Sequence, residues 1–398
     1  MIRRGPVHIR MRARDTTEAF RASSPLEALY DLVFVVAVGS LVAVLAPSIE
    51  HGTVAPRIIP FLLVFFAIWW AWINFTWFAS AYDTDDVVYR LLAVLQMAGV
   101  LVLAAGVPNA FAHDDFAVVT LGYVIMRLGQ IALWVRAAIE HPEGRPVALR
   151  YGGGVLVVQI LWCARLLLPD VGWLFLPTFL VLVVLEFATP LWAERGRGLA
   201  WHPHHIAERY ALFVLILLGE TVLAAVNGLH AALAAHGVTA PLVTIAIAGF
   251  VLLVALWWAY FLQPAGEGLA RRRQRSFVWG YGHYLLFAAL AAVGAALDAA
   301  VQVGARPAPG EQLVVGLSLA VPAGAALLLI WALHAPLLDR PGFPAAVAIP
   351  AAVLVLGGGA LAPVLGIAGS VVAIALVAAA SVATAIAAGT RAAPAPVD

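Results

Sequence analysis

Residues 212–223 read LFVLILLGETVL, and this stretch decides the class of the protein because it places one carboxylate, Glu220, inside an apolar helix. The stretch belongs to a predicted span, 204–228, that is long enough to cross a bilayer, since a transmembrane helix needs about 20 mostly apolar residues. A carboxylate at that depth is costly and therefore indicates a functional site. Predicted spans hold further ionisable residues: Asp31, Arg127, Arg165, Glu186, Glu208 and Arg209.

The composition excludes a soluble domain. Hydrophobic residues make up 63% of the 398 residues and charged residues 11%, whereas soluble domains are about 45–50% apolar and about 25% charged. We expect an all-α, polytopic integral membrane bundle of about 12 transmembrane helices. The predicted spans are 26–46, 57–79, 87–107, 116–138, 150–169, 171–193, 204–228, 239–262, 276–300, 311–335, 343–361 and 363–388. The stretch 343–388 is read either as two helices or as one helix and a re-entrant piece.

Arginine placement predicts the orientation, because cytoplasmic loops are enriched in Lys and Arg. The tail 1–24 is rich in arginine, and arginines recur in every second loop, as at Arg145 and Arg150. We therefore expect the tail 1–24 and the tail 391–398 on the cytoplasmic side of a bacterial inner membrane, with the lipid bilayer as partner. A nucleic-acid partner is not expected, because the sequence shows no soluble basic surface with base-reading residues.

Two similarities in the same order suggest an internal duplication. Residues 30–42, with Tyr30 and Gly39, align with residues 210–222, with Tyr210 and Gly219. The following spans then share WWAW at 69–72 and WWAY at 257–260. An even number of spans in each half would make the repeat parallel, with halves at 25–195 and 200–390. Chance similarity in a sequence rich in Ala, Leu and Val is the alternative.

Glu220 is predicted to face the interior of the bundle. Arg209 and Glu220 are eleven positions apart and therefore lie on nearly the same helix face, about 16 Å apart along the axis. A buried carboxylate needs a partner to stay charged, and Arg127, near the middle of its own span, is the expected one. A structural ion pair, or a protonated and hydrogen-bonded Glu220, is the alternative.

A second polar cluster is predicted where several helices begin or end on the cytoplasmic side. Glu27 and Asp31 are four residues apart and share a helix face, while Glu208 follows His204 and His205 at helical spacing. His283 is expected at similar depth. Three interpretations stay open: a structural network that caps helices, a proton or ion pathway in which His titrates near neutral pH, and a metal or haem site.

A third group combines aromatic and acidic residues after the second predicted span. Trp69, Trp70 and Trp72 lie deeper than an interfacial belt predicts, and they are followed by Asn74. These tryptophans either line a pocket for an apolar or cationic group or simply pack in the core. The acids Asp83, Asp85 and Asp86, followed by Arg90, either bind a cation or cap the next helix, and capping is favoured.

These segments resemble the bacterial low temperature requirement A family. The resemblance is carried by PLEALYDLVFV at 25–35, WWAWINFTWF at 69–78, DTDDVVYR at 83–90, Arg127, and the run from His205 to Thr221. It implies a polytopic membrane protein and brings no settled biochemical activity. The family pattern usually has Phe-Phe-Asp where this chain has Leu-Tyr-Asp31, and Gly where it has Ala211.

The function expected from these residues is that of a secondary transporter or ion-coupled carrier. A membrane sensor or structural component is the alternative, and a metal- or haem-dependent membrane enzyme is the third possibility. The expected site comprises Glu27, Asp31, Arg127, His205, Glu208, Arg209, Glu220 and His283, with Trp69, Trp70, Trp72, Asn74, Asp83, Asp85, Asp86 and Arg90 as a secondary set. The sequence identifies no cofactor, substrate, coupling ion or oligomeric state.

Overall fold

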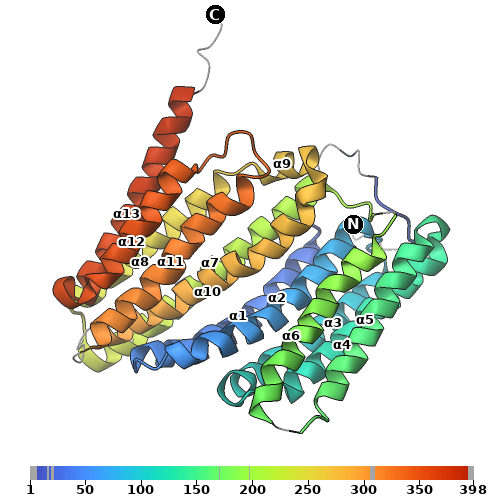
Figure 1. The fold of residues 1–398 in the computed structure, drawn as a ribbon, viewed down its shortest axis with the longest axis horizontal. Coiled ribbons are helices and arrows are strands. Elements are labelled where there is room, and N and C mark those ends of the chain that lie inside the picture. The colour runs from blue at the N-terminus through green and yellow to red at the C-terminus, as the bar shows by residue number, and fades with distance from the viewer. Residues whose placement is uncertain are drawn as a thin grey trace, which may run out of the picture. The chain divides into compact units, whose positions relative to one another are not determined.

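The computed structural model describes residues 7–15, 18, 22–169, 171–196, 198–304 and 310–392. Parts of both predicted tails, 1–24 and 391–398, therefore lie outside the described residues. Every regular element that is described is helical (Figure 1): α1 (Pro25–Glu50), η1 (Ala55–Arg57), α2 (Ile58–Ala81), α3 (Val87–His113), α4 (Ala117–Glu140), η2 (Pro142–Gly144), α5 (Arg145–Arg165), α6 (Gly172–Ala193), α7 (Pro203–His236), α8 (Ala240–Phe261), α9 (Ala265–Arg271), η3 (Arg273–Arg275), α10 (Ser276–Gly304), α11 (Glu311–His334), α12 (Ala345–Ala360) and α13 (Ala362–Ala392).

The predicted all-α membrane architecture is confirmed at the level of helices. Within the described ranges, eleven helices are long and apolar enough to cross a bilayer. α12 has 16 residues and so measures about 24 Å, less than the hydrocarbon core of about 30 Å. The stretch 343–388 thus holds one short helix and one full-length helix. The latter, α13, bends at Gly366, whose φ of 71° suits glycine because it lacks a Cβ.

The chain forms two compact units. Unit 1 consists of Met1–Ser40 and Phe66–Arg209, and unit 2 consists of Leu41–Phe65 and Tyr210–Asp398. Three helices, α1, α2 and α7, therefore contribute residues to both units. The duplication suggested by the similarity between residues 30–42 and 210–222 stays a prediction.

In unit 1, α3 packs against α4, α4 against α5, and α5 against α6. The contact between α3 and α4 depends on two glycines. A Cβ on Gly99 would lie 2.6 Å from the carbonyl oxygen of Gly122, and a Cβ on Gly122 would lie 2.6 Å from the carbonyl oxygen of Gly99. Small residues at this crossing let the two backbones touch, which is the usual way for membrane helices to associate.

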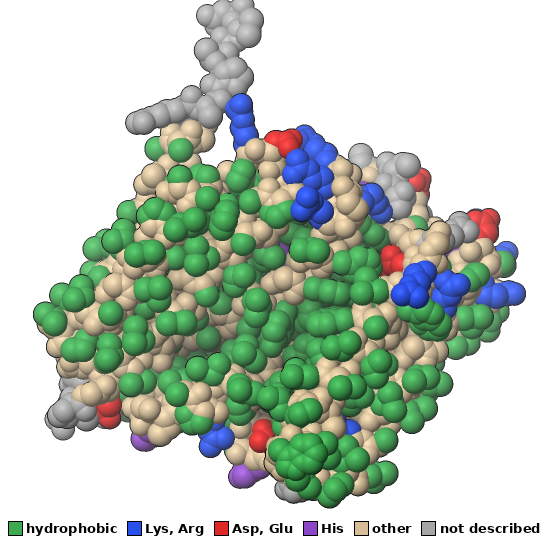
Figure 2. Space-filling view, viewed as in Figure 1, with side chains coloured by type: hydrophobic (Ala, Val, Ile, Leu, Met, Phe, Trp, Pro, Cys, Tyr) green, Lys and Arg blue, Asp and Glu red, His purple; other side chains and the backbone are tan. Residues whose placement is uncertain are grey.

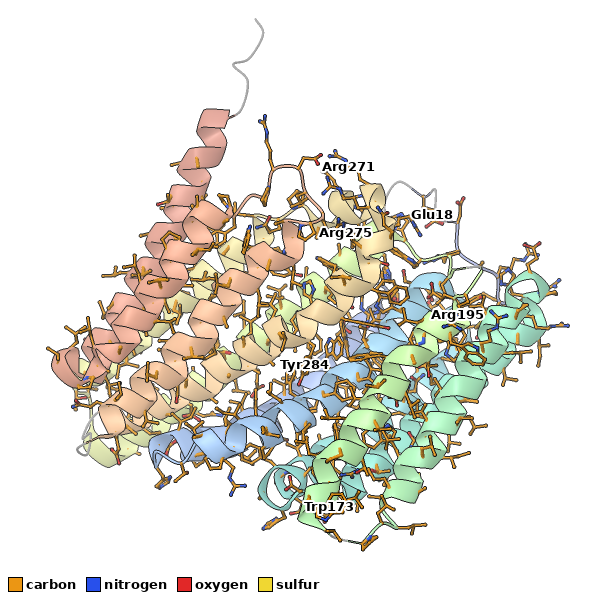
Figure 3. All side chains as sticks on the ribbon, in the orientation of Figure 1. Glu18, Trp173, Arg195, Arg271, Arg275 and Tyr284 are labelled. Carbon is orange, nitrogen blue, oxygen red and sulfur yellow. The ribbon has the colours of Figure 1, made fainter. Side chains whose placement is uncertain are left out.

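In unit 2, α10, α11, α12 and α13 pack in chain order, and α13 also packs against α8 (Figure 1). α10 is among the most enclosed helices, and its Tyr284 lies in the first third of the helix (Figure 3). The Tyr284 hydroxyl donates a 2.7 Å hydrogen bond to the carbonyl oxygen of Leu62, at the start of α2.

The outer surface suits a bilayer. Hydrophobic side chains cover most of the face shown in Figure 2, and basic side chains gather near α9. Large apolar residues are openly exposed, as at Val364, which is 81% exposed. α6 illustrates the pattern along one helix, because Trp173 lies at its start and Arg195 just beyond its other end (Figure 3). Apolar surface of this extent implies contact with lipid.

Candidate functional site

The start of α1 is fixed by a capping box between Ser24 and Glu27. The backbone N–H of Glu27 donates to Ser24 Oγ at 3.2 Å, and the backbone N–H of Ser24 donates to Glu27 Oε2 at 2.7 Å. This reciprocal arrangement is the typical start signal of a helix. It also holds the buried Glu27 side chain in place and leaves its other oxygen, Oε1, for contacts with α7.

Arg209, on α7, binds both carboxylates of α1. Its Nε and Nη2 atoms donate to the two oxygens of Asp31 at 3.0 and 2.5 Å, and its Nη1 lies 3.0 Å from Glu27 Oε1. Asp31 also accepts a 2.7 Å hydrogen bond from the indole of Trp72. A guanidinium that meets a carboxylate with two parallel bonds forms one of the strongest polar contacts in proteins. Asp31 and Arg209 therefore neutralise each other.

His205 completes this group. Its Nε2 lies 3.0 Å from Glu27 Oε1, the same oxygen that faces Arg209. All four side chains are at most 2% exposed. We call Glu27, Asp31, His205 and Arg209 the acid–imidazole centre.

The acid–imidazole centre has one negative charge in excess when His205 is neutral. Glu27 and Asp31 contribute two negative charges, and Arg209 contributes one positive charge. A proton bound by either Glu27 or His205 would balance the charges within this group of four side chains.

A second buried ion pair joins α4 and α6. Arg127 Nη2 donates to both oxygens of Glu186, at 3.2 and 3.0 Å. The Glu186 carboxylate also accepts from the indoles of Trp70, at 2.7 Å, and Trp162, at 3.2 Å. The expected pairing of Arg127 with Glu220 is therefore wrong. Glu220 was expected only because it lies at a similar depth in its span to Arg127. Glu186, which belongs to unit 1 like Arg127, accepts the hydrogen bonds of the guanidinium instead.

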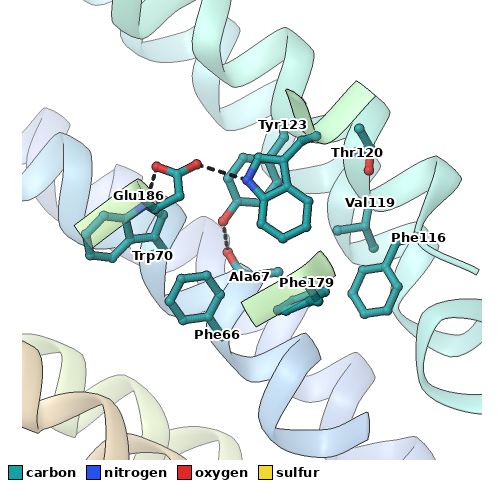
Figure 4. Close-up of a pocket in the computed structure, with 10 residues that line it drawn as sticks. Phe66, Ala67, Trp70, Phe116, Val119, Thr120, Tyr123, Phe179 and Glu186 are labelled. Carbon is teal, nitrogen blue, oxygen red and sulfur yellow. Dashed lines mark hydrogen bonds between the residues drawn. The ribbon is translucent and has the colours of Figure 1, made fainter. Parts of the chain in front are cut away.

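A small cavity of about 30 Å³ adjoins the Glu186 carboxylate (Figure 4). Its walls are mainly aromatic, and they include Trp70, one of the deep tryptophans noted in the sequence. The Tyr123 hydroxyl closes one side by donating to the carbonyl oxygen of Ala67. This volume is enough for about one or two water molecules. The cavity is lined by Phe66, Ala67, Trp70, Phe116, Val119, Thr120, Tyr123, Trp162, Phe179 and Glu186.

The remaining members of the aromatic set have structural contacts. Trp69 and Trp72 are fully buried. Asn74 donates a 2.6 Å hydrogen bond to the carbonyl oxygen of Trp70, one turn earlier in α2. Trp70 and Trp72 thus meet carboxylates, whereas Asn74 bonds its own helix.

The three aspartates before α3 are all engaged with protein groups. Asp86 is the N-cap of α3 and accepts from the backbone N–H of Tyr89 at 2.8 Å. Asp85 forms two bonds with Arg90, at 2.8 and 2.9 Å. Asp83 pairs with Arg14 at 3.3 Å. The capping interpretation therefore agrees with this geometry.

Residues 8–14 form a strap that crosses this end of unit 1. The backbone N–H of Ile9 donates to Asp86 Oδ2 at 2.7 Å, and the Ile9 carbonyl accepts from Arg136 at 2.6 Å. Arg136 also bonds Asp86 and Glu140, and the backbone N–H of Met11 donates to Glu140. The strap is thus held by side chains from the ends of α3 and α4.

The Asp86 carboxyl has a perturbed pKa. Burial raises this pKa, but hydrogen bonds from Arg136 and from the backbone of Ile9 and Tyr89 outweigh burial and lower it from 3.8 to about 2. Asp86 therefore stays ionised at any physiological pH and holds the strap as a charged acceptor.

The structure does not gather all the predicted site residues. Glu208 lies next to the centre in sequence, and its Oε1 accepts from the backbone N–H of Ser23 at 3.3 Å. His204 is only half-buried. Glu220 belongs to unit 2, where it is buried and forms no hydrogen bond or ion pair with the described residues. His283, also in unit 2, contacts aromatic residues and His334.

The sequence left a metal or haem site open as one of three interpretations of this cluster. Within the described residues, no three His, Cys, Asp or Glu side chains lie close enough together to hold a metal ion. His283 contacts Tyr260 and His334 within unit 2, whereas His205 belongs to unit 1.

Three polar residues were missed from the sequence. Arg136 and Glu140 are four residues apart near the end of a span, a spacing that indicates a helix-surface ion pair and could have been found. His334 lies in a stretch that otherwise reads as scaffold, and no spacing signal marks it. The Ser24–Glu27 capping box was also present as S-x-x-E.

Fold and site together define a polytopic membrane protein whose helices enclose ion pairs within apolar spans. The chain belongs to the bacterial low temperature requirement A family, because the model for "Bacterial low temperature requirement A protein (LtrA)" matches residues 22–389. The chain is also similar to an uncharacterized protein of Rhizobium meliloti (strain 1021). The two are 28% identical over 295 residues, which cover 69% of this chain and 68% of that relative. The family resemblance seen in the sequence is thereby confirmed.

Proposed function

We propose that this protein is a proton-coupled secondary transporter of the bacterial inner membrane and that the acid–imidazole centre holds the coupling proton. One observation carries the proposal: four side chains that are at most 2% exposed bring two carboxylates, one guanidinium and one imidazole into contact. Glu27 and His205 can each bind a proton in this group and release it again. Buried ionisable groups of this kind mark ion and proton pathways in membrane proteins.

The location of the centre in the chain supports a coupling role. Its members come from α1 and α7, and both helices continue from unit 1 into unit 2. A change in the charge of the centre would therefore act on two helices that both units share. Rocking of one bundle against another is the usual motion of secondary transporters.

Glu220 is proposed as a further proton-carrying group. It lies on α7, eleven residues after Arg209, and it has no polar partner among the described residues. A carboxylate in that environment is stable only when protonated or when it meets a cation. In this proposal Glu220→Gln also abolishes coupled flux while the protein still folds.

Everted membrane vesicles provide the test. A respiration-driven pH gradient is followed with a fluorescent dye, and a panel of solutes is added one at a time. We expect at least one solute to release protons in vesicles with the wild-type protein, and we expect no release with Glu27→Gln or Asp31→Asn. The matched control is Glu267→Gln on α9, because this carboxylate is 62% exposed and pairs only loosely with Arg271.

The outcome against the proposal is equally definite. If no solute distinguishes wild-type vesicles from Glu27→Gln vesicles at equal protein levels, the centre carries no coupling proton. If Glu267→Gln abolishes release as well, the effect comes from surface charge rather than from the centre.

A sensor is the second candidate, and the strap favours it. Residues 8–14 lie outside the spans and are held by Asp86, Arg136 and Glu140. A change in these helix ends would free a peptide segment for a partner protein. Crosslinking that captures the same partner only when Asp86→Asn frees the strap would support this candidate.

Two further expectations remain proposals. The arginine pattern places both termini in the cytoplasm, which reporter fusions at each end would test. For the duplication, Tyr30 and Tyr210 are equally buried, but Trp69 and Trp70 are buried whereas Trp257 and Trp258 are 38% and 45% exposed. If the halves are related, the second tryptophan pair has taken a different position.

A further inference from the structure

Unit 2 encloses two histidines that the proposed transport function does not use. His283 on α10 and His334 at the end of α11 are both 0% exposed, and their ring centroids lie 5.9 Å apart. Tyr260, from α8, contacts both, with its ring 5.9 Å from that of His283 and 5.5 Å from that of His334. Three helices thus bring two imidazoles and one phenol together.

The helices fix the tautomer of each imidazole. His283 Nδ1 lies 2.7 Å from the carbonyl oxygen of Trp279, and His334 Nδ1 lies 2.7 Å from the carbonyl oxygen of Ile330. A carbonyl oxygen only accepts, so each Nδ1 carries the hydrogen. In a neutral imidazole the other nitrogen, Nε2, then presents a lone pair. Metal-binding histidines are commonly oriented in this way, with the second ring nitrogen donating to a backbone carbonyl.

The two lone pairs are not equally occupied. His283 Nε2 lies 3.2 Å from the Tyr260 hydroxyl and accepts its hydrogen. His334 Nε2 is fully enclosed and has no partner among the described residues. A buried acceptor without a partner is unfavourable, so a ligand bound to this atom would stabilise it.

We propose that His283 and His334 bind one soft monovalent cation, Cu(I), through their Nε2 atoms. With metal–nitrogen bonds of about 2 Å and ring centres about 1 Å further away, two imidazoles on a linearly coordinated ion have centres about 6 Å apart. The two ring centres are 5.9 Å apart, with the rings at 84° to each other, a separation at which one ion can reach both rings. Tyr260 gives up its hydrogen bond to His283 when the ion enters.

The number and kind of ligands select the ion. Zn²⁺ takes four ligands in closed protein sites, but no group of three His, Cys, Asp or Glu side chains is present in the described part of the chain. Cu(I) accepts two ligands, and imidazole suits copper. Neither histidine has a carboxylate partner there, and a single positive charge costs far less than a double charge in a medium of low dielectric constant.

The aromatic walls also suit a soft cation. Trp279 is 1% exposed, and its ring lies 4.3 Å from that of His283 and 6.1 Å from that of His334. Tyr210 lies 4.9 Å from His283. Electron-rich ring faces stabilise a desolvated cation, and tryptophan does so best.

Silver binding tests this site in the full-length protein in detergent, because Ag⁺ has the charge and ligand preference of Cu(I) without its redox chemistry. The free thiol of Cys163 would compete for silver, so all variants carry Cys163→Ser. The site variants are His283→Phe and His334→Phe. The matched control is His230→Phe, an exposed histidine on α7. Bound silver is counted after desalting, and X-ray absorption identifies the neighbouring atoms.

We expect one silver ion per protein with nitrogen neighbours in the Cys163→Ser protein and in the His230→Phe control, and none in either site variant. Cu(I) added with a competing chelator under reducing conditions should follow the same pattern. If His334→Phe elutes as aggregate, His334→Gln replaces it as the site variant, because glutamine keeps a polar side chain at this position but offers no soft ligand. Silver that remains in the site variants, sulfur neighbours, or no stoichiometric binding at all would overturn the proposal.

Discussion

Replacing Arg127 with Met should cost about 3–5 kcal/mol of unfolding free energy, because it leaves the Glu186 carboxylate buried without a countercharge. The two side chains are only 4% and 2% exposed, and the adjoining cavity of about 30 Å³ has room for only one or two water molecules, which do not supply a countercharge. Trp70 and Trp162 still donate to Glu186, which places the expected cost toward the lower end of that range. The double variant Arg127→Met/Glu186→Gln removes both charges and keeps an acceptor for the indoles, so it should cost only about 1 kcal/mol.

Equilibrium unfolding in mixed micelles of dodecyl maltoside and sodium dodecyl sulfate, followed by tryptophan fluorescence, measures these differences. The control is Arg90→Met, which breaks an ion pair with Asp85 whose side chains are 54% and 45% exposed. An exposed pair contributes little to stability, because water screens the charges. The reasoning is refuted if Arg127→Met costs no more than Arg90→Met, or if the double variant is as unstable as the single one.

Three further predictions follow from the same contacts. Between pH 3.8 and about 2, protonation of Asp86 should remove about 2 kcal/mol of stability, because a lowered carboxyl pKa stabilises the fold only above that range. Limited proteolysis of residues 8–14 should rise in this window, and the rise should be smaller in Asp86→Asn, where Glu140 still titrates against the strap. Gly99→Leu should destabilise the protein by about 1–3 kcal/mol through overpacking. Gly153→Leu should leave the stability unchanged, because Gly153 has open space around it. Thermal unfolding in detergent measures both variants. Arg209→Met should lower the yield of folded protein more than any exposed arginine variant, measured by size-exclusion chromatography, because two buried carboxylates lose their cation.

Composition and hydropathy were sufficient to predict the membrane class and most helices, because a helix that crosses a bilayer must satisfy its backbone internally and present apolar side chains. The length of the helix at 345–360 was harder to predict. The stretch 343–361 is uniformly apolar, so hydropathy could not reveal that only 16 residues form α12. A positive φ at Gly366 also cannot be read from a run of small residues.

The four residues of the acid–imidazole centre were among the eight expected from the sequence, but their separation from the other four and the pairing of Arg127 were not predictable. Glu27, Asp31, His205 and Arg209 were all chosen because charged groups in apolar spans are costly. The choice between Glu186 and Glu220 as partner of Arg127 depends on which helices are neighbours, and helical periodicity gives no information about neighbours in a bundle. His334 was missed for the same reason, because its relation to His283 exists only in three dimensions.

The protonation state of the acid–imidazole centre in lipid bilayers is the measurement that tests the account most directly. Solid-state NMR of protein with ¹⁵N-labelled histidine reports the charge of His205, with His205→Gln to assign its signal, and infrared difference spectra with Glu27→Gln report a protonated carboxyl. The account predicts one proton in the centre at neutral pH, seen either as a charged His205 or as a protonated Glu27. A neutral His205 beside two ionised carboxylates would contradict it.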